Sequence, residues 1–107
     1  MRMWNINPKY MCRKHLLGEH LEMHMFAGCI NKNKSIKGYI DTGLVDTSNI
    51  NNRHEELSME IINRGYNHKS PLPHIDIRST GNICIDNNII DLSSRCKDCR
   101  KLLKEII

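Results

Sequence analysis

The sequence predicts an all-α fold, namely a compact single-domain helical bundle of about three main helices with long loops. Three observations indicate this fold. With 107 residues, the chain is long enough for one modest core but not for two independent ones. Hydrophobic residues make up 39% of it, which is close to ordinary globular usage. Apolar residues also recur at helical spacing in separate stretches. We therefore predict one domain over residues 1–107.

The first predicted helix opens at Asn7 and Pro8, where asparagine is a good N-cap and proline suits the first helical position. Residues 12–27 contain no proline. Their apolar side chains fall on more than one side of a helix, which predicts that this helix is half buried. These side chains are Leu16, Leu17, Leu21, Met23, Met25 and Phe26.

Residues 31–52 are rich in polar and turn-forming types, so we expect a long connection with some local structure. Asn51 or Asn52 is a suitable N-cap for a second helix that runs through Ile62. Gly65 stands where a left-handed C-cap is expected after that helix.

The sequence Ser-Pro-Leu-Pro at residues 70–73 blocks a helix. The isoleucine-rich stretch 83–90 predicts either a small hairpin or a loop. A last helix follows, with Asp91 or Ser93 as its cap. Its apolar positions recur every three or four residues at Leu92, Cys96, Cys99, Leu103 and Ile106.

The composition bounds the class of protein. The chain has 16 Lys plus Arg against 12 Asp plus Glu, a net charge of +4 that permits nucleic-acid binding without requiring it. No apolar run approaches the roughly 20 residues of a membrane span, and the N-terminus lacks the apolar core of a secretory signal. Five irregularly spaced cysteines argue against a disulfide framework. We therefore expect a soluble cytoplasmic protein with reduced thiols.

Residues 12–24 hold the densest group of reactive side chains, three histidines and two glutamates. On a helix, His15, Glu19 and Glu22 fall within a narrow arc, whereas His20 and His24 lie one turn apart on another face. Three interpretations remain open: a solvated helix face, acid/base chemistry between a carboxylate and a histidine, or a metal ion shared by two histidines.

Cys96 and Cys99 form a single C-x-x-C pattern, for which Cys12 and His15 could supply the other half of a zinc site. Both cysteines also lie on the apolar stripe of the last predicted helix, where cysteine behaves as a small hydrophobe. The pattern alone favours core packing over zinc, so no metal ligand is predicted.

Several short segments together resemble a known family. They are Met1-Arg2-Met3-Trp4, His15-Leu16-Leu17, Glu22 and Arg64-Gly65-Tyr66-Asn67. In order and spacing they resemble the pyrimidine-dimer DNA glycosylases, the family of bacteriophage endonuclease V. The similarity covers roughly residues 1–71 and is loose in the last third of the chain.

The resemblance implies a mechanism. In that family the α-amino group of the first residue attacks the sugar C1′ of the damaged nucleotide and forms an imine, and a helix glutamate assists the proton transfers that break the strand. These roles fall on Met1 and Glu22. An α-amino group ordinarily has a pKa of about 7.7–8.0, so it is partly neutral and nucleophilic near neutral pH. No metal or organic cofactor is expected.

The same resemblance places Arg2 on a phosphate or on the lesion and lines the site with His15. We also predict substrate contacts from Lys14, His20 and His24 on the same helix.

Two departures from the family are visible. Its arginines beside the glutamate and one turn further on are replaced here by Leu21 and Met25, and this chain ends without the family's basic, aromatic tail.

The predicted function is DNA repair-type N-glycosylase with abasic-site lyase activity. The predicted partner is double-stranded DNA with a damaged, modified or abasic nucleotide. We expect the protein to be a monomer that does not bind membranes. If a phage encodes the chain, we expect it in the host cytoplasm. The alternative is a non-catalytic module on the same fold that binds nucleic acid or holds a structural metal through His20, His24 and nearby cysteines.

Overall fold

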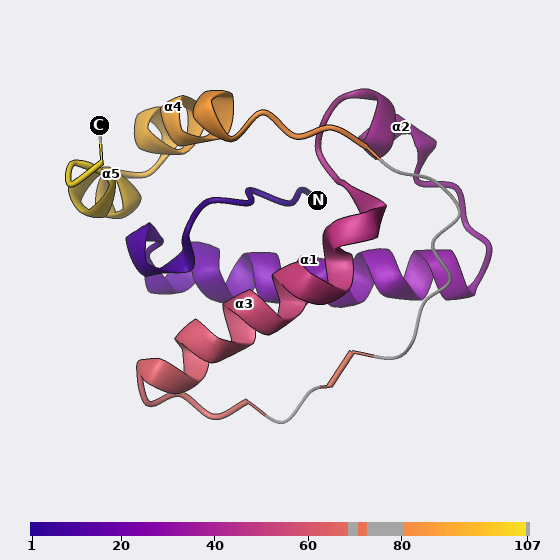
Figure 1. The fold of residues 1–107 in the computed structure, drawn as a ribbon, viewed down its shortest axis with the longest axis horizontal. Helices are drawn as coiled ribbons and strands as arrows, with labels where there is room; N and C mark the ends of the chain where they lie inside the picture. The colour runs from indigo at the N-terminus through magenta and orange to yellow at the C-terminus, as the bar shows by residue number, and fades with distance from the viewer. Residues whose placement is uncertain (69–70, 73–80, 107) are drawn as a thin grey trace.

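A computed structural model describes residues 1–68, 71–72 and 81–106. Within these ranges the chain forms helices and no strand, which confirms the predicted all-α class (Figure 1). The elements are a 3-10 helix η1 (Pro8–Tyr10), α1 (Arg13–Asn31), α2 (Lys37–Asp41), a 3-10 helix η2 (Thr47–Asn49), α3 (Ile50–Asn63), α4 (Ile85–Arg95) and α5 (Lys97–Leu103). None of the helices in the described part of the chain is both long enough and apolar enough to cross a membrane.

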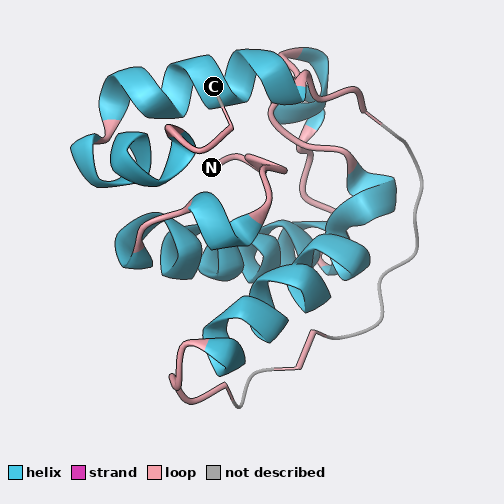
Figure 2. Cartoon of the chain, turned by 60° about the vertical axis from the view of Figure 1, so that its left-hand side comes forward, coloured by secondary structure: helices cyan, strands magenta, loops and turns pink. Residues whose placement is uncertain are grey.

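The helices form two groups on either side of the N-terminal segment. α1 and α3 cross and pack on each other, and α4 and α5 pack together. In both views the segment that begins at the N-terminus runs between these groups (Figures 1 and 2). This arrangement encloses the first residues of the chain between α1 and α4.

One hydrophobic core joins the two groups. From the N-terminal segment come Met3, Ile6 and Met11, all at most 1% exposed. The other fully buried large side chains come from α1, α3, α4 and α5, and they are Leu16, Met23, Phe26, Ile50, Leu57, Ile61, Leu92 and Leu103. The Cα radius of gyration is 13.6 Å, which is typical of a single domain of this length.

The predicted helix opening at Asn7 and Pro8 is confirmed only as a short turn. The Asn7 side chain accepts a hydrogen bond from the backbone N–H of Lys9 (3.2 Å), which caps η1. Met11 then turns to an extended conformation, with φ −102° and ψ 140°, so the helix does not continue. α1 begins only after Cys12, its N-cap residue.

The second predicted helix is present, but its start differs. α3 begins at Ile50 with Asn49 as the N-cap residue, two residues before the predicted cap Asn51 and three before Asn52. The connection before α3 contains α2 and η2, which agrees with the local structure predicted for residues 31–52. Gly65 has φ +84°, so the predicted left-handed C-cap is confirmed.

The prediction for residues 83–90 is wrong, because Ile85 begins a helix, α4, in place of a hairpin or loop. The last predicted helix is in fact two helices. They are separated at Cys96, whose φ of −125° and ψ of 114° interrupt the helix. Asp91 and Ser93 are therefore inside α4 and cap nothing. Of the predicted helix break at residues 70–73, Pro71 and Leu72 are described and are not helical, whereas residues 70 and 73 lie outside the described residues.

A buried ion pair joins α1 to α3. The Arg53 guanidinium donates two hydrogen bonds to the Glu19 carboxylate, at 2.5 and 2.8 Å, and both side chains are fully buried. Arg53 also contacts Glu56, one turn further along α3. This bidentate contact fixes how the two long helices lie against each other.

Candidate functional site

The N-terminal segment is held in place by contacts from three directions. The backbone N–H of Met3 donates to the carbonyl of Leu44 (2.6 Å) in the connection after α2. From α4, the carbonyl oxygen of the Asn88 side chain accepts a hydrogen bond from Arg2 (2.6 Å), and Asp91 forms an ion pair with Arg2 (2.9 Å). The Met1 side chain is partly buried against the core.

Trp4 and Asn88 complete this contact between the segment and α4. The Asn88 side-chain amide donates to the carbonyl of Trp4 (2.7 Å), and Asn88 is only 5% exposed. The Arg2 guanidinium lies 3.8 Å from the centre of the Trp4 ring, a cation–π contact. These contacts hold the N-terminal segment against α4.

Glu19 holds the segment from the opposite side. Its carboxylate accepts hydrogen bonds from the backbone N–H groups of Trp4 and Asn5 as well as from Arg53. Burial raises the pKa of the Glu19 carboxyl group, and the bonds from Arg53 and the two backbone groups oppose that rise. The ion pair between α1 and α3 therefore also anchors the start of the chain.

A polar pocket of about 270 Å³ lies beside Arg2. Its walls come from the connection after α2, from the residues before α4 and from α4 itself, and they include Leu44, Asn82, Asn87 and Asp91. Amide and carboxylate groups in such a pocket can hydrogen-bond a polar ligand close to the N-terminus.

Glu22 and His15 lie on one side of α1, two turns apart. Glu22 is half buried and close enough to His15 to raise the pKa of the imidazole, although burial first and the Lys14 charge second lower that pKa more strongly. The His15 ring also meets the Trp4 ring edge to face, with centroids 6.2 Å apart. Lys14 itself is exposed to solvent.

His20 and His24 belong to a different cluster that faces α3. His20 Nε2 lies 2.8 Å from His68 Nε2, and His24 Nε2 lies 3.1 Å from His54 Nε2. Burial, followed by the charges of His54, His68 and His24, lowers the pKa of His20 to about 4. We call His20, His24, His54 and His68 the histidine cluster.

The structure therefore divides the predicted substrate contacts into two places. His15 and Glu22 lie on one side of α1, and His20 and His24 lie against α3, as the helical spacing predicted. The positions where the resembled family has arginines are exposed, Leu21 at 60% and Met25 at 47%.

The sequence does not indicate which residues from distant segments contact the N-terminal segment and α1. Asn88 and Asp91, which bind Arg2, lie more than 80 residues away in the chain, and no local pattern identifies them. His54 and His68 carried a weak signal, since histidines are scarce and the chain has six. The number of histidines does not indicate which helix faces His54 and His68 occupy.

The fold and the site define a helical protein whose N-terminal segment is enclosed between two pairs of helices, with a glutamate and a histidine on one side of α1. A family model described as pyrimidine dimer DNA glycosylase matches residues 1–74, more than half of the chain. The chain belongs to the pyrimidine dimer DNA glycosylase family. Searches among curated proteins and among solved structures gave no match.

Proposed function

We propose that this protein removes a damaged or modified base from duplex DNA and then cleaves the strand at the resulting abasic site. Met1 provides the nucleophilic α-amine, and Glu22 assists the proton transfers. The family match over residues 1–74 carries the proposal, because it includes both residues and their surroundings on α1.

The proposed reaction has two stages. The amine nitrogen attacks C1′, the bond between C1′ and the base breaks, and the base leaves with a proton. The amine then passes a proton to the ring oxygen O4′ as the bond between C1′ and O4′ breaks, which opens the sugar and gives a protonated imine. Removal of a proton from C2′ breaks the bond between C3′ and its phosphate oxygen, and water releases the enzyme from the imine.

The enclosure of the N-terminal segment supports this role for Met1. Nucleophilic attack is fast only when the nucleophile is held in a narrow range of positions. Hydrogen bonds at Arg2, Met3 and Trp4 fix the backbone within three residues of the amine. A terminus anchored in this way loses little further entropy when the sugar approaches.

The position of Glu22 supports its role in proton transfer. Its carboxylate is half buried on the same helix that holds the N-terminal segment through Glu19. A carboxylate that is partly shielded from water suits a group that accepts and returns a proton.

The substitution Glu22→Gln tests this assignment. Glutamine keeps the shape of the side chain but accepts no proton, so we expect cleavage of an abasic duplex to fall by about 100-fold or more while the unfolding temperature changes little. The assay follows strand cleavage on a gel alongside thermal unfolding by circular dichroism.

Glu105→Gln is the matched control, because Glu105 is exposed at the far end of the chain. We expect this variant to cleave like the unaltered protein. If Glu22→Gln also cleaved at the unaltered rate, the role of Glu22 would be rejected, and cleavage absent from the unaltered protein would favour a non-catalytic DNA-binding module.

A further inference from the structure

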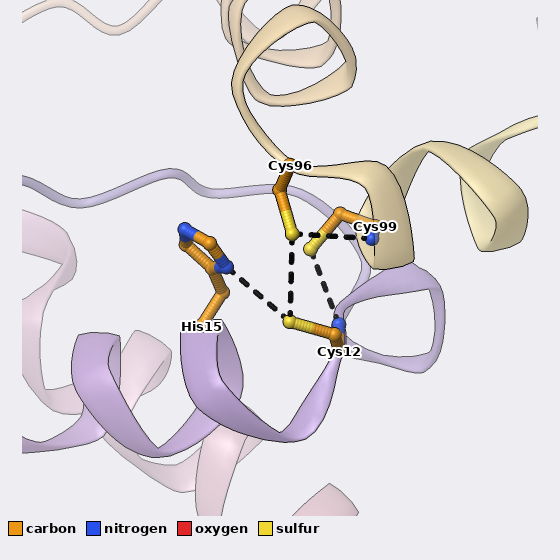
Figure 3. A group of neighbouring side chains, drawn as sticks. All are labelled: Cys12, His15, Cys96 and Cys99. Atoms are coloured by element: carbon orange, nitrogen blue, oxygen red, sulfur yellow. Dashed lines mark hydrogen bonds between the residues drawn. The ribbon is translucent and has the colours of Figure 1, made fainter.

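Three cysteines and one histidine converge at the joint between α1 and the C-terminal helices. Cys12 and His15 come from the start of α1, and Cys96 and Cys99 come from the joint between α4 and α5 (Figure 3). One ligand atom from each of these four side chains lies within 4.8 Å of each of the others. We call these four residues the cysteine cluster.

Two distances within the cysteine cluster are close to the edges of a zinc tetrahedron. Cys12 Sγ lies 3.8 Å from Cys96 Sγ and 3.3 Å from His15 Nδ1. In tetrahedral zinc with Zn–S bonds of about 2.3 Å and Zn–N bonds of about 2.0–2.1 Å, two sulfur ligands lie about 3.8 Å apart, and sulfur and nitrogen about 3.5 Å apart. The side chains are thus spaced like ligands around one ion.

Backbone groups around the sulfur atoms are also arranged as in a metal site. The N–H of Cys99 donates to Cys96 Sγ (3.4 Å), and the N–H of Cys12 donates to Cys99 Sγ (3.2 Å). Hydrogen bonds of this kind orient thiolate ligands and partly neutralise their charge. Both halves, C-x-x-H and C-x-x-C, also have the ligand spacing of structural zinc sites.

We propose that Cys12, His15, Cys96 and Cys99 bind a structural zinc ion. Four protein ligands complete the tetrahedron, so no position remains open for water or substrate, and the ion stabilises the fold without taking part in the reaction. Cys99 is fully buried and the other three side chains are half buried, which protects the site from solvent. Binding displaces the thiol protons, which pass to solvent.

The zinc ion would join a part of the chain that lies inside the family match to a part that lies beyond it. Cys12 and His15 lie inside the matched residues 1–74, whereas Cys96 and Cys99 lie beyond them. The C-terminal helices cover the N-terminal segment through Asn88 and Asp91. A zinc ion at the cysteine cluster therefore links α4 and α5 to the start of α1.

Metal content and thiol chemistry test the proposal on the unaltered protein. We expect about one zinc per chain by elemental analysis after growth with added zinc. Chelation under denaturing conditions should release three thiols that a thiol reagent does not reach in the native protein. A native protein that holds no zinc and binds none on titration would overturn the proposal, as would a Cys12–Cys96 disulfide in freshly prepared protein.

Cobalt substitution identifies the ligands. Cobalt bound by cysteine thiolates absorbs in the near ultraviolet through charge transfer from sulfur, and we expect this band in the unaltered protein. Cys96→Ser should weaken binding of cobalt by at least about tenfold, whereas Cys84→Ser, at an exposed cysteine, should leave it unchanged. Cobalt bound without the thiolate band, for example at the histidine cluster, would overturn the proposal.

His15 permits a rescue experiment. His15→Ala should weaken metal binding, and His15→Cys should restore it with a stronger thiolate band, because cysteine is also a zinc ligand. Since a structural site stabilises the folded state, chelation should also lower the unfolding temperature and shift the fluorescence of Trp4, the single tryptophan, toward that of a solvated ring. Equal binding by all three forms would exclude His15 as a ligand.

Discussion

Arg2 contacts three protein groups, although its buried Nε has no hydrogen-bond partner among the described residues. Its guanidinium pairs with Asp91, donates to Asn88 and lies on the Trp4 ring. A role in holding phosphate, which the family resemblance implies, therefore competes with contacts inside the protein. These contacts hold Arg2, the residue next to Met1, at the pocket beside α4.

The exposed side chains Leu21 and Met25 offer a test of DNA contact. We expect the double substitution of both by arginine to strengthen binding to duplex DNA, because each new charge can neutralise a phosphate. The logarithm of affinity should fall more steeply with the logarithm of salt concentration, by about 0.9 for each added contact. Fluorescence anisotropy at several salt concentrations measures this slope.

The matched control places arginine at Met59, which is 67% exposed on α3. It adds the same charge on a different helix from Glu22, so the slope should change less than with a single arginine at Leu21 or Met25. Equal effects at all three positions would indicate that DNA does not approach the Glu22 side of α1.

For individual residues, the sequence indicates the chemical types that form the site but not which residues contact one another. The two faces of α1 follow from helical geometry, so the separation of His15 from His20 and His24 was predictable. The burial of Glu19 was not, because it depends on Arg53, which lies 34 residues away. For Cys96 and Cys99 the sequence favours core packing over zinc, since only the fold brings Cys12 and His15 to the C-x-x-C pair.

Among the elements, the crossing of α1 and α3 rests on the Glu19–Arg53 pair. Replacing Arg53 by methionine leaves a buried carboxylate without its partner, so we expect a loss of about 3–5 kcal/mol in the free energy of unfolding. Replacing both residues by methionine should cost less than the sum of the two single changes. Urea unfolding of the three variants measures this coupling.

Additive effects would contradict the pairing of Glu19 with Arg53. The double variant should nevertheless remain less stable than the unaltered protein, because the backbone N–H groups of Trp4 and Asn5 lose their acceptor when Glu19 is removed.

The histidine cluster predicts a loss of stability in acid. His20 has a pKa of about 4 in the folded protein against an ordinary value of 6.5, so the unfolded chain binds a proton more readily. The stability contribution of neutral His20 is complete above pH 6.5 and falls as the pH drops from 6.5 toward 4. His24, His54 and His68 face the ring, and Glu55 lies against His54.

Thermal unfolding between pH 7.5 and pH 4.5 measures this effect. We expect His20→Gln to lose less of its unfolding temperature across that range than the unaltered protein does, because glutamine takes up no proton. Parallel curves for the two proteins would show that His20 does not contribute to the acid sensitivity.

Helix α4 illustrates the limit of sequence reasoning for elements. Its isoleucines favour strand on local grounds, and Asp86-Asn87-Asn88 reads as a turn. The structure makes it helical because Leu92 and Asn88 occupy one face, where leucine enters the core and asparagine binds the Trp4 carbonyl. These contacts are formed only after the N-terminal segment is in place, so they override the local preference.

For the whole molecule, the enclosed N-terminus connects the fold to the proposed chemistry. α1 and α3 form one side, α4 and α5 form the other, and the first residues lie between them (Figure 2). The all-helical class and one core were predictable from composition and periodicity. The position of the N-terminal segment between the two pairs of helices was not predictable, because the contacts of Arg2, Trp4 and Glu19 link segments that are distant in the sequence.

The most direct measurement is borohydride trapping on abasic and UV-irradiated duplex DNA, with the N-terminus either free or chemically blocked. Reduction converts a transient imine into a stable covalent adduct. We expect an adduct that maps to Met1 and disappears when the N-terminus is blocked. An adduct that survives blocking, or none on either substrate, would contradict the proposal that the terminal amine is the nucleophile.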